Sequence, residues 1–222
     1  MKDIAKFIAG FERFQLKYFQ EEHGLFSQLR HSQQPRALVI SCCDSRVDPA
    51  MLTGADPGDL FVVRNVANLV PPYRHEAEAP GIRSALEFAV KTLEVEHIIV
   101  LGHSNCGGIQ VLMNDEDVTA SQYEFIGAWL SIAKRARERV LRELPQKSAE
   151  LQARACEQAS ILVSLDNLLS FPWIRERVDN DKLTLHGWYF DMDSGELLAY
   201  LSETATFVSL VAENRPDKSR DE

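Results

Sequence analysis

The stretch RALVISCCDSR (residues 36–46) decides the fold, because a short apolar run passes directly into a group of chemically active side chains. The run at residues 37–40 is wholly apolar, which is typical of a buried strand in a parallel sheet. Cys42, Asp44 and Arg46 follow at once. In open α/β sheets the carboxyl ends of the strands form the crevice where ligands bind. We therefore expect these three side chains to lie at such a crevice.

The stretch HIIVLGHSNCGG (residues 97–108) repeats this arrangement. Its apolar run ends at Gly102, which we expect to let the chain turn sharply after the strand. His103 and Cys106 come next, and Cys106 is expected at or near a helix N-terminus, where the helix dipole favours a thiolate. Two such clusters, each at the end of a predicted strand, can converge on one site.

Further segments complete the prediction of an α/β fold, with a central, mostly parallel β-sheet flanked by helices and a C-terminal antiparallel hairpin. A third apolar run at residues 60–63 follows the turn residues 56–59 and predicts another strand. Helical spacing is found over 82–94, 104–113 and most of 122–169, and the hairpin is predicted from 183–190 and 196–201, joined by a turn around 193–195.

Residues 1–30 are predicted to form an N-terminal helical arm. Large apolar side chains recur there at close to helical spacing, namely Ile4, Phe7, Ile8, Phe11, Phe14 and Phe19. So many phenylalanines need cover, either from their own domain or, the interpretation that we favour, from a partner subunit. No linker divides the chain, so residues 1–222 are expected to form a single domain with a polar tail at 213–222.

The composition of the 222-residue chain is that of a globular protein, with 45% hydrophobic and 26% charged residues. Its formal net charge of −9 disfavours nucleic acids and anionic membrane surfaces as partners, because both repel an acidic protein. We expect neither a transmembrane helix nor a signal peptide from these residues. The four cysteines do not resemble a disulfide framework, so a reducing cytoplasm is the expected location.

Cys42, His103 and Cys106 form a soft nitrogen and sulfur ligand set, the kind that suits zinc. Structural zinc sites usually close with four ligands, whereas catalytic sites hold three and leave a position open for water. Each part also has a simpler interpretation. A cysteine after a strand is often a small buried hydrophobic residue, and Asp44 with Arg46 could be a surface ion pair. Their combination favours a zinc-activated water.

The motifs C-x-D-x-R (residues 42–46) and H-x-x-C-G-G (residues 103–108) resemble those of the β-class carbonic anhydrases. Supporting motifs are PGDLF (57–61), RNVANLVPPY (64–73) and LHGW (185–188). The second of these is similar to the plant-like branch of that family. The resemblance covers most of the chain, from the N-terminal helix to about residue 201.

This resemblance implies reversible hydration of carbon dioxide to bicarbonate and a proton, by attack of a zinc-bound hydroxide. It implies one Zn²⁺ per subunit, held by Cys42, His103 and Cys106. Asp44 would accept a hydrogen bond from the hydroxide, and Arg46 would keep Asp44 ionised and off the metal. In some family members the aspartate binds zinc at lower pH and closes the site, and the sequence leaves that closed state open for Asp44.

Substrate contacts implied by the resemblance lie mostly outside the ligand motifs. Phe61 and Val66 match apolar pocket residues, and Gln33 matches a glutamine that donates to a substrate oxygen. The backbone N–H of Gly107 is a further candidate donor. Plain core packing is an equal alternative for Phe61 and Val66. Phe88 stands where family members often carry a tyrosine.

One subset of the family has a second, inhibitory bicarbonate pocket lined by Trp, Arg and Tyr. The matching positions here are Val39, Arg64 and Phe190, so only the arginine is kept. Arg64 is therefore expected to be structural, and no inhibition by bicarbonate through that pocket is expected.

Homodimers or larger homo-oligomers are also implied, with carbon dioxide and bicarbonate as small-molecule partners. Two other functions stay open. The first is a hydrolase of carbon disulfide or carbonyl sulfide on the same scaffold, which would share every ligand. The second is a non-catalytic zinc or redox protein, in which Cys42 and Cys106 form a disulfide when the metal is lost. The intact Asp44–Arg46 pair disfavours the second, because a structural zinc site has no need for it.

Overall fold

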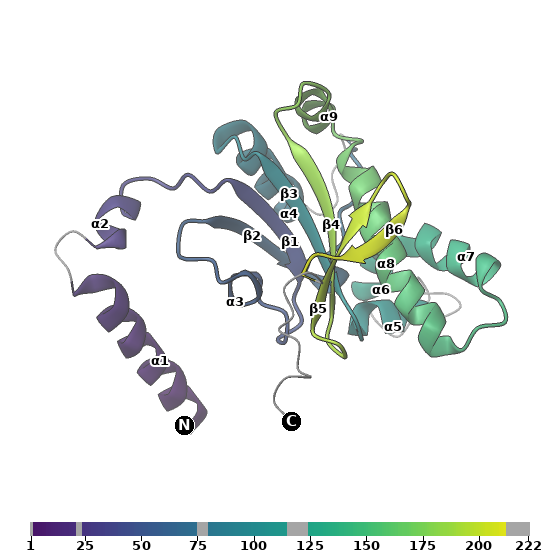
Figure 1. Ribbon diagram of the computed structural model, residues 1–222, viewed down its shortest axis with the longest axis horizontal. Coiled ribbons are helices and arrows are strands. Elements are labelled where there is room, and N and C mark those ends of the chain that lie inside the picture. The colour runs from purple at the N-terminus through teal and green to yellow at the C-terminus, as the bar shows by residue number, and fades with distance from the viewer. Residues whose placement is uncertain (1, 21–23, 75–79, 115–123, 212–222) are drawn as a thin grey trace, which may run out of the picture.

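A six-stranded sheet in the order β2-β1-β3-β4-β5-β6 lies at the centre of this computed structural model (Figure 1). The first four strands in that order are parallel, and β5 and β6 continue the sheet in antiparallel fashion. The strands are β1 (Ala37–Cys42), β2 (Leu60–Asn65), β3 (His97–His103), β4 (Thr184–Asp191), β5 (Glu196–Leu201) and β6 (Thr206–Ser209). The predicted mostly parallel α/β sheet with a C-terminal hairpin is confirmed.

The structure describes residues 2–20, 24–74, 80–114 and 124–211, so the predicted polar tail at 213–222 lies outside the described residues. Helices in these ranges are α1 (Lys2–Phe19), α2 (Leu25–Leu29), α3 (Pro49–Thr53), α4 (Pro80–Glu87), α5 (Gly107–Asn114), α6 (Ile126–Leu130), α7 (Lys134–Glu143), α8 (Ala149–Leu168) and α9 (Pro172–Asp179). Short 3₁₀ turns cover Val66–Asn68 (η1) and Ser131–Ala133 (η3), and a π-helical turn covers Phe88–Thr92 (η2). None of the helices in the described ranges is both long and apolar enough to cross a bilayer.

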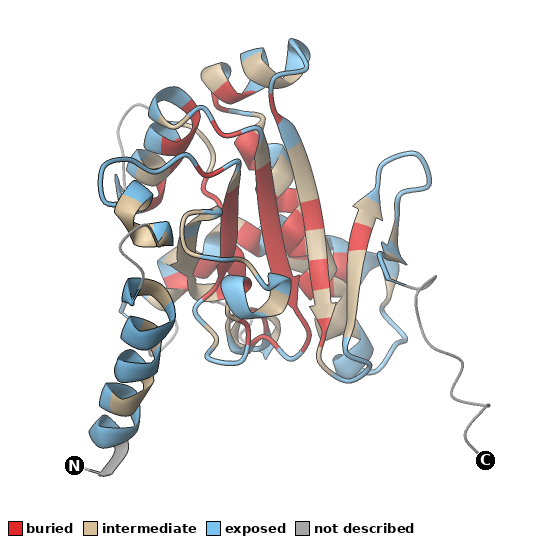
Figure 2. Cartoon of the chain, turned by 60° about the vertical axis from the view of Figure 1, so that its left-hand side comes forward, coloured by how far each residue is buried: buried red, intermediate tan, exposed pale blue. Residues whose placement is uncertain are grey.

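The adjacent strands β1 and β3 are buried along most of their length (Figure 2). Side chains alternate between the two faces of a strand, so Leu38 and Ile40 of β1 share a face with Ile98 and Val100 of β3. These four side chains are fully buried in the main core, which also contains residues of α4, α8 and α9. The helices therefore cover one face of the sheet and hold β1 and β3 in a fixed register.

Two details near the strand ends differ from the sequence prediction. The helix predicted over 104–113 begins only at Gly107, because residues 104–106 form the loop that carries Cys106. The predicted turn at Gly102 is wrong, since Gly102 lies inside β3. A glycine is needed there for another reason: a Cβ at this position would lie 2.8 Å from Cδ1 of the buried Ile161 on α8.

Gly102→Ala is expected to lower the free energy of unfolding by about 1–3 kcal/mol, because overpacking forces buried neighbours out of their preferred rotamers. Thermal unfolding of the variant measures this. The Ile161→Ala change removes both Cδ1 and Cγ1, the two atoms that would lie within 3.0 Å of the new Cβ, so G102A should cost less stability in the I161A background than in the wild type. Gly81→Ala in α4 is a matched control, since a Cβ there meets nothing within 4 Å. Equal melting temperatures for G102A and G81A would contradict this account of Gly102.

The N-terminal segment is a long helix, as predicted, and it extends away from the sheet (Figure 1). Near its C-terminal end, the hydroxyl of Tyr18 donates to Oδ1 of Asp56 at 3.0 Å. Six large apolar side chains of α1 are each between 57% and 68% exposed, namely Ile4, Phe7, Ile8, Phe11, Leu16 and Phe19. An exposed apolar stripe of this size is typical of a surface that contacts a partner.

Candidate metal centre

Cys42, His103 and Cys106 converge at one end of the sheet, as the sequence predicted. Cys42 and His103 are the last residues of the adjacent parallel strands β1 and β3, and Cys106 directly precedes α5. Their ligand atoms all lie within 4.8 Å of one another, and the two sulfurs are 4.0 Å apart. All three residues are at most 5% exposed. Parallel pairing of β1 and β3 brings the three side chains to one point.

The ring of His103 is oriented for metal binding. Its Nδ1 lies 2.8 Å from the carbonyl oxygen of Ser104, which fixes the proton on Nδ1 and leaves the lone pair on Nε2. Nε2 is buried and has no hydrogen-bond partner among the described residues. Buried polar atoms rarely lack a partner, and a metal ion would satisfy this one.

The two cysteines also fit a divalent cation. A hydrogen bond from the Cys106 thiol stabilises the Cys42 thiolate and lowers the pKa of Cys42 to about 4, and it raises the pKa of Cys106, because a second thiolate at this distance would be repelled by the first. A bound dication removes that repulsion and allows both to ionise. Two thiolates with one imidazole form a known catalytic zinc set, in which the fourth position stays open. The residues present therefore fit Zn²⁺.

Asp44 and Arg46 form a two-pronged ion pair next to the ligands. Nε and an Nη of Arg46 donate to the two carboxylate oxygens of Asp44 at 2.9 and 2.7 Å, and the backbone N–H of Arg46 donates at 3.0 Å. The hydrogen bond from the Arg46 side chain holds the pKa of Asp44 well below its usual range. The same guanidinium donates to the carbonyl oxygen of Asn105, which lies between His103 and Cys106. Arg46 thus connects the Asp44 carboxylate to the loop of residues 104–106 (the ligand loop).

Arg64 supports the loop after β1 from the neighbouring strand. It donates to the carbonyl oxygens of Cys42 at 2.9 Å and Asp44 at 2.7 Å, and to the carboxylate of Asp48 at 3.1 Å. Asp48 in turn caps the N-terminus of α3. These contacts confirm the structural role predicted for Arg64. Its side chain holds the backbone of the ligand Cys42 and of Asp44.

The loop between His103 and Cys106 is fixed by contacts that sequence reasoning missed. The backbone N–H of Ser104 donates to the carbonyl of Phe190 at 2.9 Å, and its hydroxyl accepts from the N–H of Met192 at 2.8 Å. Asn105 adopts a left-handed conformation (φ 56°), which asparagine tolerates better than most residues. The dipeptide between the ligands was visible in the sequence, but its partners, at the end of β4 and just after it, lie more than 80 residues away.

A second missed residue is Glu157 of α8. Its Oε1 accepts from the backbone N–H of Cys106 at 3.0 Å. No motif surrounds Glu157 in the sequence, so only the structure could connect it with the metal ligands.

Val66 and Gly107, two of the predicted substrate contacts, lie beside the ligands of the same chain. Val66 packs against the cluster that contains Cys42 and Cys106, and its carbonyl accepts from the indole N–H of Trp129 at 2.8 Å. Gly107 is exposed at the start of α5. Both therefore remain candidates for contact with a small substrate at the open position.

Gln33 and Phe61 do not reach the ligands of their own chain. Phe61 pairs with Leu38 near the start of β1, whereas Cys42 is at its end, so about 13 Å of strand separates them. Gln33 is exposed and precedes β1. The ring of Phe61 instead contacts Phe88, with 6.0 Å between ring centroids.

Comparison with known proteins agrees with this site. The sequence profile of the carbonic anhydrase family matches residues 37–197. The chain is 47% identical to β carbonic anhydrase 5 of Arabidopsis thaliana, a chloroplastic protein, over 79% of this chain and 57% of that protein. It is 37% identical to a carbonic anhydrase of Synechocystis sp., over 93% of this chain and 74% of that one.

Solved structures show the same relationship. The β-carbonic anhydrase CcaA matches with a TM-score of 0.86 and 36% identity, over 94% of this chain and 92% of that chain. One of two tetrameric β-carbonic anhydrases from Sordaria macrospora matches with a TM-score of 0.79 and 28% identity, over 90% of this chain and 97% of that chain. The chain therefore belongs to the carbonic anhydrase family. Within that family, its relatives include β carbonic anhydrases of Arabidopsis thaliana and a carbonic anhydrase of Synechocystis sp..

Proposed function

We propose that this chain catalyses the reversible hydration of carbon dioxide to bicarbonate and a proton. The observation that carries this proposal is the placement of three buried ligands, Cys42, His103 and Cys106, beside the Asp44–Arg46 pair. A structural metal site would need a fourth protein ligand, and it would have no use for an ion-paired carboxylate next to the metal. Membership in the family supports the same reaction.

A zinc ion held by the three ligands would lower the pKa of a bound water to near neutrality and so supply a nucleophile. Asp44 acts on that water. Its Oδ1 already receives two hydrogen bonds from Arg46, whereas Oδ2 receives one and keeps a free lone pair. Oδ2 is therefore the oxygen that would accept a hydrogen bond from the reacting water and orient it. The half-buried Val66 packs against the cluster that contains Cys42 and Cys106, and it would offer an apolar contact to an uncharged substrate there.

Arg46 has two tasks in this mechanism. It keeps Asp44 ionised, so that the carboxylate remains a hydrogen-bond acceptor through the neutral range. It also holds Asp44 against the ligand loop through the carbonyl of Asn105. An aspartate held by three donors from one arginine is pre-oriented before substrate arrives, which is the basis of electrostatic preorganisation.

The experiment that tests the proposed function is stopped-flow hydration of carbon dioxide by zinc-loaded protein between about pH 6.5 and 9, a window around the lowered pKa of zinc-bound water. The rate should rise with pH, because the nucleophile forms as the water loses its proton, while Asp44 stays ionised throughout. Absence of hydration at every pH, with zinc bound and the fold intact, would contradict the proposal. The same protein should then be tested on carbonyl sulfide and carbon disulfide.

We also propose that a second copy of this chain completes the substrate pocket. Phe61 pairs near the start of β1 and Gln33 precedes that start, whereas Cys42 is at the other end of the strand, so a partner subunit could place both residues at the open position. The exposed apolar stripe of α1 supports such pairing, and so does Val62 of β2, which is 40% exposed. The tetrameric relatives from Sordaria macrospora point to the same kind of assembly.

Mixed assemblies test this pocket. Gln33→Ala should keep zinc but hydrate carbon dioxide slowly, and Cys42→Ser should bind no zinc, so each variant alone is expected to be poorly active. Randomly mixed dimers of the two should recover about a quarter of wild-type activity, since half of the dimers contain one complete site of two. If Gln33 acts in its own chain, the mixture will be no more active than its parts.

We propose a reducing compartment such as the cytoplasm as the place of action. All four cysteines are free. Cys42 and Cys106 must be thiolates to bind a metal, and a disulfide between them would remove two of the three ligands.

A further inference from the structure

Glu157 is a buried carboxylate for which the proposed reaction has no direct use. It is 4% exposed, and its Oε2 accepts from the hydroxyl of the fully buried Tyr189 at 2.7 Å. Its Oε1 accepts from the backbone N–H of Cys106. No ion pair involves Glu157 in the described ranges, where Arg154 on the same helix pairs with Asp191. Burying a carboxylate without a cation costs free energy, so good packing alone does not account for this residue.

The backbone position of Cys106 depends on this side-chain contact, whereas strand pairing fixes the backbones of the other two ligands. Cys42 and His103 end hydrogen-bonded strands, which fix their backbones. Cys106 follows Asn105, whose conformation is left-handed, and lies outside the regular part of α5. On its N-terminal side, the bond from its N–H to Glu157 is what anchors its backbone to α8.

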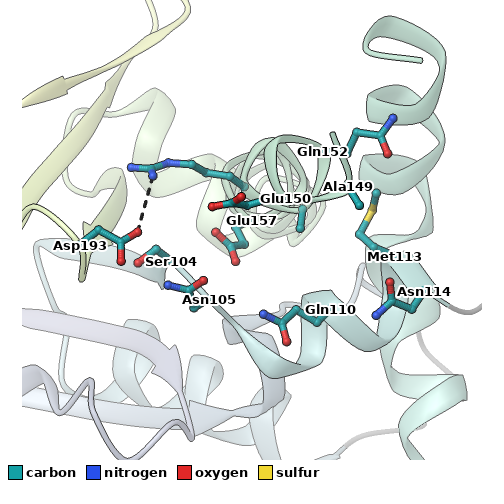
Figure 3. A pocket seen from close by; sticks show the side chains of 12 residues that line it. Ser104, Asn105, Gln110, Met113, Asn114, Ala149, Glu150, Gln152, Glu157 and Asp193 are labelled. Atoms are coloured by element: carbon teal, nitrogen blue, oxygen red, sulfur yellow. Dashed lines mark ion pairs between the residues drawn. The ribbon is translucent and has the colours of Figure 1, made fainter. Parts of the chain in front are cut away.

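Glu157 lines a cleft with a volume of about 260 Å³ and a mostly polar set of side chains. Figure 3 shows its side chain among them. Ser104 and Asn105, the two residues between His103 and Cys106, line the same cleft. Water can enter a polar space of this size. If the Glu157 side chain is shortened, a water can therefore satisfy the N–H of Cys106, so the chain should still fold. A mobile water cannot fix the position of that backbone as a packed side chain does.

We propose that Glu157 is a positioning residue for the metal centre, which fixes Cys106 through its backbone N–H and is itself held by Tyr189. This inference rests on the zinc site of the proposed function. The carboxylate links α8 to the ligand loop, and Tyr189 links it in turn to β4. Sγ of Cys106 is thereby held near the ligand atoms of Cys42 and His103, where a shared zinc ion would need it.

Two conservative variants of Glu157 separate the effect of its contact with Cys106 from the effect of its negative charge. Glu157→Asp keeps the charge but is one methylene too short to reach the N–H of Cys106. Glu157→Gln loses the charge but keeps the reach, since its amide oxygen can accept from Cys106 while its NH₂ donates to Tyr189. Zinc affinity of the full chain is measured by competition with a chromophoric chelator. E157D should lose about 10–100-fold, the usual effect of removing such an outer partner, and E157Q should stay within about threefold of wild type.

Cobalt substitution gives a second readout, because the absorption of Co²⁺ reports its coordination geometry. The spectrum should change in E157D and not in E157Q. Tyr189→Phe, which frees Oε2, should give a smaller loss of zinc affinity. Glu150→Asp is the matched control on α8, since Glu150 lines the same cleft without a contact to the ligand loop. Wild-type affinity in E157D, or a loss in E157Q as large as in E157D, would overturn the proposal. Because zinc binding is measured directly, this result is independent of whether the protein hydrates carbon dioxide.

Discussion

Cys42→Ser is expected to abolish tight zinc binding and to lower carbon dioxide hydration by a factor on the order of 10³ or more, because the hydroxyl of serine does not ionise near neutral pH. The substitution removes one of the two negative charges that hold the dication. Cys106 and His103 alone would leave two ligands, too few for a stable site. Metal content after dialysis and stopped-flow hydration measure the two effects.

Cys43→Ser is the matched control for that variant. Cys43 is the next residue in the chain, but it is exposed and lies outside the ligand cluster. The C43S protein should therefore keep both zinc and activity. Zinc bound at wild-type affinity in C42S, or lost to the same extent in C43S, would show that the metal is not held by the cluster at the ends of β1 and β3.

The fold and the ligand set were predictable from sequence because both depend on local signals. A short, wholly apolar run such as residues 37–40, which contains the β-branched Val39 and Ile40, favours a buried strand over a helix, and a polar cluster directly after it is then expected at the sheet's end. Two such runs were enough to predict that Cys42 and His103 converge. The order of the strands was not predicted, because pairing is decided by contacts between residues far apart in the chain.

The supporting contacts could not be predicted for the same reason. Gly102 reads as a turn signal in the sequence, but the side chain of Ile161, 59 residues later, occupies the space where its Cβ would lie. Glu157 and Tyr189 are ordinary residues of a helix and a strand until the fold brings them to Cys106. Likewise, the distance between Phe61 and Cys42 becomes evident only when the register of β1 and β2 is known.

Asp44→Asn is expected to lower kcat for hydration by about 10²–10³-fold while zinc stays bound, because it removes a preorganised group from the reacting water. The amide has one oxygen where the carboxylate has two, and Arg46 occupies that oxygen as donor. The NH₂ group then faces the water with a donor instead of the lone pair of Oδ2. Zinc content and stopped-flow kinetics of the same sample separate loss of metal from loss of orientation.

Asp48→Asn provides the comparison, since Asp48 is a carboxylate of the same loop that also pairs with an arginine, Arg64. It caps α3 and does not approach the ligands, so its substitution should lower the melting temperature slightly and leave kcat within about twofold of wild type. The difference between the two variants isolates the role of Asp44. Wild-type kcat in D44N would remove the aspartate from the mechanism, and zinc would then have to orient the water without help from this loop.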